Sequence, residues 1–149
     1  MNKHMVLKIR EATDNDIRGL TDLTVQLGYT STVESMKARF NNIQQHPDYH
    51  TLLADYNGKI IGMIGLSKSY YYEVDGFYVR ILALVVDSYH RNQGVGKKLI
   101  EHAENWARKA GAAGISLNSG KRPERMTAHQ FYKNRGYREK SIGFVKSLL

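Results

Sequence analysis

Residues 77–86, FYVRILALVV, form the stretch that most restricts how this chain can fold. Arg80 is the only charged residue in it. Such a run is typical of a strand that is buried on both faces in the middle of a sheet. A sheet of this kind must be covered by other secondary structure, so the run predicts an α/β fold in which helices pack against a central sheet.

Helices and strands alternate along the rest of the sequence. Strands are expected at 6–10, 51–55, 59–66, 77–86, 115–118 and 141–148, and helices at 14–27, 31–45, 95–110 and 123–135. Asn57 and Gly58 join the second and third strands, because this pair accepts the positive φ of a tight hairpin turn. No repeat, linker or low-complexity stretch interrupts the pattern, so a single domain over residues 1–149 is expected.

The composition excludes several classes of function. The chain has no cysteine, which rules out disulfides, thiolate metal sites and a cysteine nucleophile. Its longest strictly apolar run, residues 81–86, is too short to span a bilayer, and the first residues lack the apolar core of a signal peptide. We therefore expect a soluble cytoplasmic protein with neither a metal site nor a membrane contact.

The net charge of +8 favours an anionic partner. Nucleic acid, an acidic membrane surface and a phosphorylated small molecule all fit this charge. The densest basic groups lie at residues 91–98 and 121–138. Nucleic acid is the weaker interpretation, because the sequence has no zinc-finger spacing, arginine-rich tail or aromatic RNA-binding motif.

A turn with two glycines, HRNQGVGKKL at residues 90–99, follows the apolar strand. A strand, a turn and a helix start place free backbone N–H groups and the positive end of the helix dipole together, which favours an anion such as phosphate. Gly94 and Gly96 would let the backbone approach this anion, and Arg91 and Lys97 would add positive charge. The spacing differs from the P-loop and dinucleotide fingerprints. A solvated turn that merely joins strand and helix explains these residues equally well.

Residues 86–107, VDSYHRNQGVGKKLIEHAENWA, resemble the acyl-CoA-binding segment of the GNAT superfamily of acetyl-CoA-dependent N-acetyltransferases. Arg91, Gly94 and Gly96 stand at the positions of its signature. AHQFYKNRGY, residues 128–137, is similar to a second segment of the family, and the order of elements resembles the family over essentially the whole chain. The resemblance implies a mixed, mostly antiparallel central sheet flanked by helices, with a splayed central strand pair that binds acyl-CoA.

The resemblance also implies that acetyl-CoA is the co-substrate. Its pyrophosphate would be bound by backbone N–H groups of the glycine turn, and its pantetheine arm would pair with the backbone of the preceding strand. The chain departs from the family at Arg125, where relatives often carry an asparagine that contacts the pantetheine. The implied cofactor-binding residues are Leu84, Val86, Arg91, Asn92, Gln93, Gly94, Val95, Gly96, Lys97 and Asn118. Lys97, Arg122 or Lys133 would meet the remaining phosphate.

The implied reaction is direct attack of a primary amine on the acetyl thioester in a ternary complex. Tyr132 matches a family tyrosine that gives a proton to the departing thiolate. Its helical spacing is also compatible with a packing role. Ala83 stands where many relatives carry a carboxylate, so the base is another residue or a water. Glu73 and Asp75 are candidates, although a solvated loop explains them equally well.

The acceptor expected from the sequence is a small molecule rather than a protein. A set of aromatic residues would hold the amine of the acceptor or form the surface of a homodimer. These residues are Tyr29, Tyr70, Tyr71, Tyr72, Phe77 and Tyr78. The alternative function is a non-catalytic GNAT-like module that senses acyl-CoA or contacts nucleic acid. Ala83 leaves this alternative open, and Tyr132 argues against it.

Overall fold

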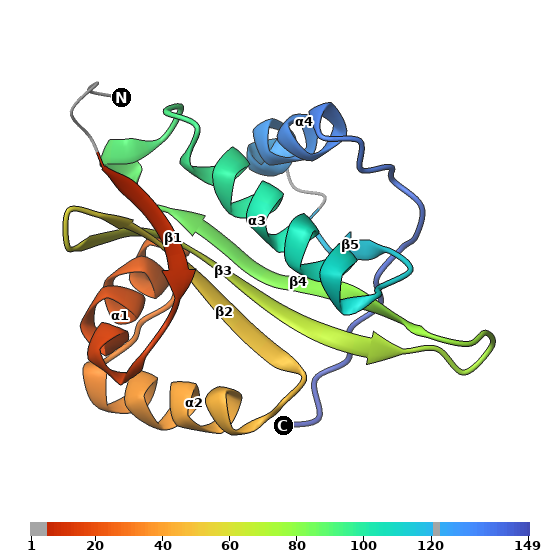
Figure 1. The fold of residues 1–149 in the computed structure, drawn as a ribbon, viewed down its shortest axis with the longest axis horizontal. Coiled ribbons are helices and arrows are strands. Elements are labelled where there is room, and N and C mark those ends of the chain that lie inside the picture. Colours follow the sequence, from red (N-terminus) through yellow and green to blue (C-terminus); the bar gives the residue numbers. More distant parts are fainter. Residues whose placement is uncertain (1–5, 121–122) are drawn as a thin grey trace.

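The computed structural model describes residues 6–120 and 123–149. One sheet has the strand order β1-β2-β3-β4-β5, in which the first four strands are antiparallel neighbours and β5 is parallel to β4. The strands are β1 (Leu7–Glu11), β2 (Tyr49–Tyr56), β3 (Lys59–Tyr70), β4 (Phe77–Val86) and β5 (Ile115–Leu117), and the helices are α1 (Ile17–Gln26), α2 (Val33–Gln45), α3 (Val95–Ala110) and α4 (Met126–Asn134) (Figure 1). This arrangement confirms the mostly antiparallel α/β fold expected from the sequence.

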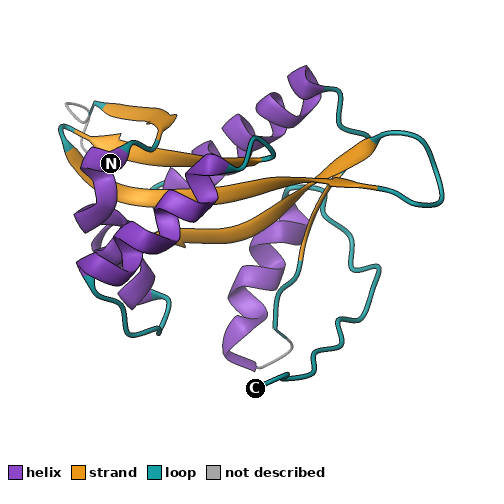
Figure 2. Cartoon of the chain, turned by 90° about the horizontal axis from the view of Figure 1, so that it is seen from below, coloured by secondary structure: helices purple, strands orange, loops and turns teal. Residues whose placement is uncertain are grey.

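The two faces of the sheet are covered by different helices. Leu99 and Ile100 of α3 belong to a large buried cluster that includes Leu52 of β2. Phe40 of α2 belongs to a second cluster that includes Leu53. Because successive residues of a strand point to opposite faces, α3 covers one face and α1 and α2 cover the other. Figure 2 shows helices on both sides of the sheet.

Helix α3 approaches the sheet closely at Gly62 of β3. A Cβ at this position would lie 3.0 Å from Leu99 Cδ1 and 3.1 Å from Val95 Cγ1. A side chain at position 62 would therefore push the first turns of α3 away from the strands. The absence of a side chain there sets the position of the α3 N-terminus above β3 and β4.

Several local signals act as the sequence indicated, with small shifts. Asn57 and Gly58 have φ values of 50° and 91°, as the hairpin turn requires. The first helical segment is capped by Thr13, whose hydroxyl accepts from Asn15 N, so it begins close to the expected position. Helix α2 is capped by Thr32, whose hydroxyl accepts from Ser35 N at 3.1 Å. No helix among the described residues combines the length and apolar character needed to cross a membrane.

The prediction of a strand at residues 141–148 is wrong. Residues 137–149 follow α4 without helix or strand and end away from the sheet (Figure 2). Their apolar side chains are exposed: Ile142 64%, Phe144 91%, Val145 98%, Leu148 90% and Leu149 118%. A strand needs a neighbour whose backbone groups pair with it, and this segment pairs with no strand of the described chain.

Candidate cofactor and catalytic site

Strands β4 and β5 separate after a short contact. They pair only where Val79–Ile81 meets Ile115–Leu117. Beyond this point, residues 83–86 of β4 pair with β3 on one edge, and no other described strand pairs with their second edge. Leu84 and Val86, both expected to contact the cofactor, lie in this stretch. The geometry matches the splayed strand pair that the resemblance implied, and it leaves an edge that a peptide-like ligand can pair with.

A bulge lies where the two strands separate. Gly65 pairs with Ala83 and Leu66 pairs with Ile81, so Leu82 has no partner on β3. A bulge bends its strand and leaves one residue unpaired. Leu82 is also 46% exposed, despite its position in an apolar run. Sequence analysis missed this residue, because no glycine or proline in β4 signals an irregularity.

The glycine turn leads directly into α3. Gly94 has φ of 84°, and no atom lies within 4 Å of the position that its Cβ would occupy. The first bond of α3 runs from Lys98 N to Gly94 O, 3.1 Å, so the N–H groups of residues 95–97 have no partner within the helix. These groups and the positive end of the helix dipole form a place where a phosphate group can bind.

Some residues expected at the cofactor have structural contacts of their own. The side chain of Val95 is 1% exposed in the core, so only its backbone can face a ligand. Gly96 lies against the ring of Phe131. The guanidinium of Arg91 donates from Nε to Val86 O at 3.3 Å, which ties the turn to the end of β4. The side chains of Asn92 and Lys97 are exposed, and that of Gln93 is half-buried.

Asp87 holds the turn in place, and sequence analysis missed it. This buried carboxylate accepts hydrogen bonds from Gln26 Nε2 at 2.7 Å and from Tyr89 N at 3.2 Å, and its Oδ2 lies 2.9 Å from His90 Nδ1. The hydrogen bond from Gln26, followed by that of His90, lowers the pKa of Asp87. The network joins the end of α1 to the start of the glycine turn.

Tyr132 lies on α4 and packs against the large cluster. Its ring centroid is 5.4 Å from that of Phe131 and 6.1 Å from that of Tyr137. Burial raises the pKa of Tyr132, and the nearby Arg125 opposes this shift. No described residue forms a hydrogen bond with its hydroxyl. The phenol therefore keeps its proton at neutral pH and has it free to donate.

The remaining sequence candidates are not gathered at one point. Asn118 is exposed and directly follows β5, where that strand leaves β4. Glu73 and Asp75 are exposed in the loop that projects beyond the other strands (Figure 1). Five residue steps along β4 separate Phe77, which follows this loop, from Leu82, roughly 17 Å at 3.3 Å per residue. The fold thus keeps both carboxylates away from the open edge of β4.

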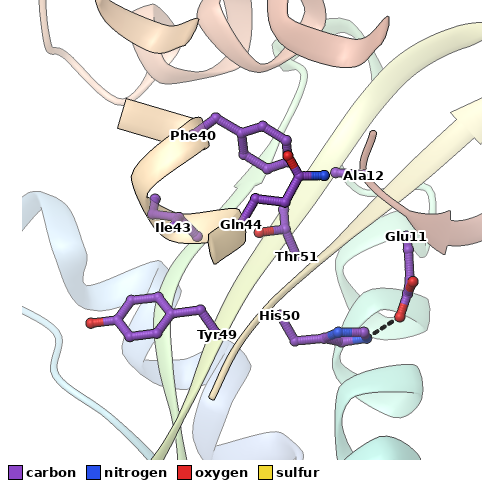
Figure 3. A pocket seen from close by; sticks show the side chains of 8 residues that line it. All are labelled: Glu11, Ala12, Phe40, Ile43, Gln44, Tyr49, His50 and Thr51. Carbon is purple, nitrogen blue, oxygen red and sulfur yellow. Dashed lines mark ion pairs between the residues drawn. The ribbon is translucent and has the colours of Figure 1, made fainter. Parts of the chain in front are cut away.

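Two small cavities lie elsewhere. One of about 180 Å³ opens between the ends of β1 and α2 and the start of β2, where Glu11 Oε1 lies 3.1 Å from His50 Nε2 (Figure 3). The other, of about 200 Å³, lies between α3 and the segment before β5. Neither cavity is lined by a residue that the sequence placed at the cofactor.

Comparison with known proteins identifies the class. The model of the GNAT acetyltransferase family matches residues 18–137. An aminoalkylphosphonate N-acetyltransferase of Salmonella typhimurium is 31% identical over 144 residues, which cover 96% of this chain and 92% of the relative. The chain belongs to the GNAT acetyltransferase family. It is an acetyl-CoA-dependent N-acetyltransferase, as the sequence resemblance indicated.

Solved structures agree with this assignment. A GNAT family acetyltransferase of Staphylococcus aureus is 33% identical, with a TM-score of 0.84 and coverage of 97% of this chain and 100% of the other. An aminoglycoside N-acetyltransferase in complex with CoA also has a TM-score of 0.84, covering 100% of this chain and 99% of the other, at 20% identity. At that identity the second likeness concerns the fold alone.

Proposed function

We propose that this chain transfers the acetyl group of acetyl-CoA to the primary amine of a small molecule by direct attack in a ternary complex. The observation that carries the proposal is the open edge of β4, residues 82–86, which leads to the free N–H groups at the start of α3. One continuous surface thus offers backbone partners for a peptide-like arm and a binding place for a pyrophosphate.

The orientation of the co-substrate follows from this surface. With the pyrophosphate at residues 93–97, the pantetheine arm runs back along Val86 and Leu84 toward Leu82. The thioester then lies where β4 and β5 separate, beside the bulge. Asn118, which directly follows β5, is placed to contact the arm from the other side of the opening.

The chemistry needs two contributions from the chain. The neutral amine attacks the thioester carbonyl, a C–N bond forms, and the C–S bond breaks. A backbone N–H of β4 polarises the carbonyl, and Tyr132 gives its proton to the departing thiolate. The amine loses its extra proton to water, because Ala83 supplies no carboxylate and the fold keeps Glu73 and Asp75 away from the opening.

We propose that the acceptor is a small amine that also carries an anionic group. The relative from Salmonella typhimurium is named for aminoalkylphosphonates, small molecules of this kind. The net charge of +8 favours an anionic ligand over a polycation. The exposed aromatic residues Tyr70 and Tyr72 stand on the β3–β4 hairpin beside Glu73 and, like that carboxylate, lie away from the open edge of β4.

Release of free thiol from acetyl-CoA tests the proposal. The acceptor panel contains aminoalkylphosphonates, amino acids, uncharged alkylamines, aminoglycosides and peptides. We expect thiol release with small amines that carry an acidic group. No turnover with any acceptor, together with salt-sensitive binding to DNA or RNA, would support the non-catalytic module instead.

We also propose a homodimer, in which residues 141–148 of one copy pair with the free edge of β5 in the other. The exposed apolar side chains of this segment and the second edge of β5, unpaired among the described strands, support it. Light scattering should report a dimer for the natural chain and a monomer for Phe144→Asp; a monomeric natural chain contradicts the proposal. The cytoplasmic location and the single domain over residues 1–149 stay predictions.

A further inference from the structure

A row of polar side chains crosses the sheet from β2 to β5. Tyr49 pairs with Ser67, Ser67 with Arg80, and Arg80 with Ser116. Val79 and Ile81, on either side of Arg80, are buried in the cluster that contains α3. Since strand residues alternate between faces, the side chain of Arg80 points to the opposite face.

Arg80 is an unpaired cation in this row. Its side chain is exposed, and it forms no ion pair or hydrogen bond with any residue in the described part of the chain. Arg10, by comparison, bonds to both Asp16 and Asp55. The row contains no acidic residue, so its donors are a guanidinium, two serine hydroxyls and a phenol. This donor set suits an oxyanion, which a guanidinium binds with two parallel hydrogen bonds.

Ser67 adds an independent observation. The residue is 6% exposed, and its hydroxyl has no hydrogen-bond partner among residues 6–120 and 123–149. Among the described residues, the buried side-chain atoms without a partner are Ser31 Oγ, Ser119 Oγ and Arg135 Nε, so the Ser67 hydroxyl itself still reaches solvent. Ser67 is the cross-strand partner of Arg80, so its hydroxyl is free to donate to a ligand that is bound to the guanidinium.

The row lies close to the reacting group. Arg80 is two residues from the bulge at Leu82, about 7 Å along the strand. In the proposed function the thioester lies at this bulge, and the amine attacks there. A group that is separated from the amine by only a few bonds comes within reach of the long Arg80 side chain.

We infer that Arg80, together with Ser67 and Ser116, binds the anionic group of the acceptor and so selects amines that carry a phosphonate, phosphate or carboxylate. The inference rests on the proposed function, because it takes the position of the thioester from it. It assigns substrate selection to the middle of β4, whereas the cofactor contacts lie at the end of that strand.

Paired acceptors and a matched variant test the inference. We compare kcat/KM for 2-aminoethylphosphonate and for ethanolamine, which lacks the anionic group, in the natural chain, Arg80→Gln, Ser67→Ala and Arg108→Gln. Arg108 is an exposed arginine of α3, on the opposite face, so its replacement removes the same charge elsewhere. We expect Arg80→Gln to lower the phosphonate value about 10–100-fold and the ethanolamine value by less than about twofold. Ser67→Ala should lower kcat/KM only for 2-aminoethylphosphonate. Arg108→Gln should leave kcat/KM unchanged for both acceptors.

Two kinetic outcomes overturn the inference while the proposed function stands. In the first, Arg80→Gln lowers kcat/KM by the same factor for both acceptors. In the second, Arg108→Gln lowers kcat/KM for 2-aminoethylphosphonate as much as Arg80→Gln does. Calorimetric titration of the protein with 2-aminoethylphosphonate, with and without CoA, adds a readout that needs no turnover. Unchanged affinity in Arg80→Gln also overturns the inference. Absence of acetyl transfer to every amine contradicts the proposed function itself.

Discussion

Gly96 of α3 lies against the ring of Phe131 on α4: a Cβ at position 96 would stand 3.4 Å from Phe131 Cζ. Gly94, two residues earlier, borders open space and has φ of 84°. Glycine is therefore required to different degrees at these two positions of the turn. Gly94 is required by backbone conformation and by access to a ligand, whereas a Cβ at Gly96 would only come into ordinary van der Waals contact with Phe131.

We expect Gly94→Val to lose most of the affinity for acetyl-CoA, because its side chain would stand where the pyrophosphate approaches. The left-handed conformation would also cost the fold about 1–2 kcal/mol. Gly96→Ala is the matched control: its methyl group fits beside Phe131, and alanine favours a helix, so affinity and stability should be retained. Urea unfolding and calorimetric Kd for acetyl-CoA measure both effects. A folded Gly94→Val protein with normal affinity would show that the turn does not bind phosphate.

Tyr132→Phe should lower kcat while leaving the fold and the Kd for acetyl-CoA nearly unchanged. The substitution keeps the buried ring and removes the proton that the raised pKa of Tyr132 retains at neutral pH. General acid catalysis is typically worth about 10²–10⁴-fold, and we expect the lower end because a thiolate is a good leaving group. The measurement is kcat with the best acceptor.

Tyr137→Phe provides the control for this experiment. Its hydroxyl donates to Glu104 Oε2 at 2.9 Å, which joins the segment after α4 to α3. Its loss should reduce stability by about 1 kcal/mol and leave kcat largely intact. Equal kcat in Tyr132→Phe and the natural chain would leave Tyr132 as a packing residue only.

Asp16→Asn should destabilise the fold by about 1.5–3 kcal/mol, the usual worth of hydrogen bonds to a charged group. The buried carboxylate bonds to Arg10 at 2.9 Å and accepts from Thr13 N at 2.8 Å. The hydrogen bond from Arg10 lowers the pKa of Asp16 below its ordinary value of 3.8. The carboxylate thus stabilises the fold above this value, and the stabilisation is lost as the pH falls below it. Urea unfolding across the acid range should show a shallower decline for Asp16→Asn; an identical decline refutes the assignment.

His50 should make the fold less stable in mild acid. Its ring stacks on Trp106 at 4.6 Å and 4°, and burial is the main cause that lowers its pKa from 6.5, assisted by Lys68 and opposed by Glu11. The unfolded chain therefore binds a proton more readily, and the free energy of unfolding decreases as the pH falls through about 6.5. His50→Phe keeps the stacked ring and should weaken this decrease, measured by urea unfolding at about pH 7.5 and about pH 5. An unchanged pH dependence would contradict the prediction.

The sequence by itself determined the elements whose signals are local. The bounds of β4 and α3 agree with those expected, because an apolar run and a glycine turn specify a buried strand and a helix start over a few neighbouring residues. The same holds for the turn at Asn57 and Gly58. The motif around Arg91 also identified the family, because its residues are adjacent in the chain.

Only the tertiary structure decided features that depend on residues far apart in the sequence. The bulge at Leu82 arises from the register of β3 against β4, and the segment at 137–149 forms no strand because no described strand pairs with it. The packing of Gly96 on Phe131 and the alignment of Ser67, Arg80 and Ser116 likewise join separate elements. Local sequence patterns carry no information about such pairings, since strand register and helix packing are set by contacts across the whole fold.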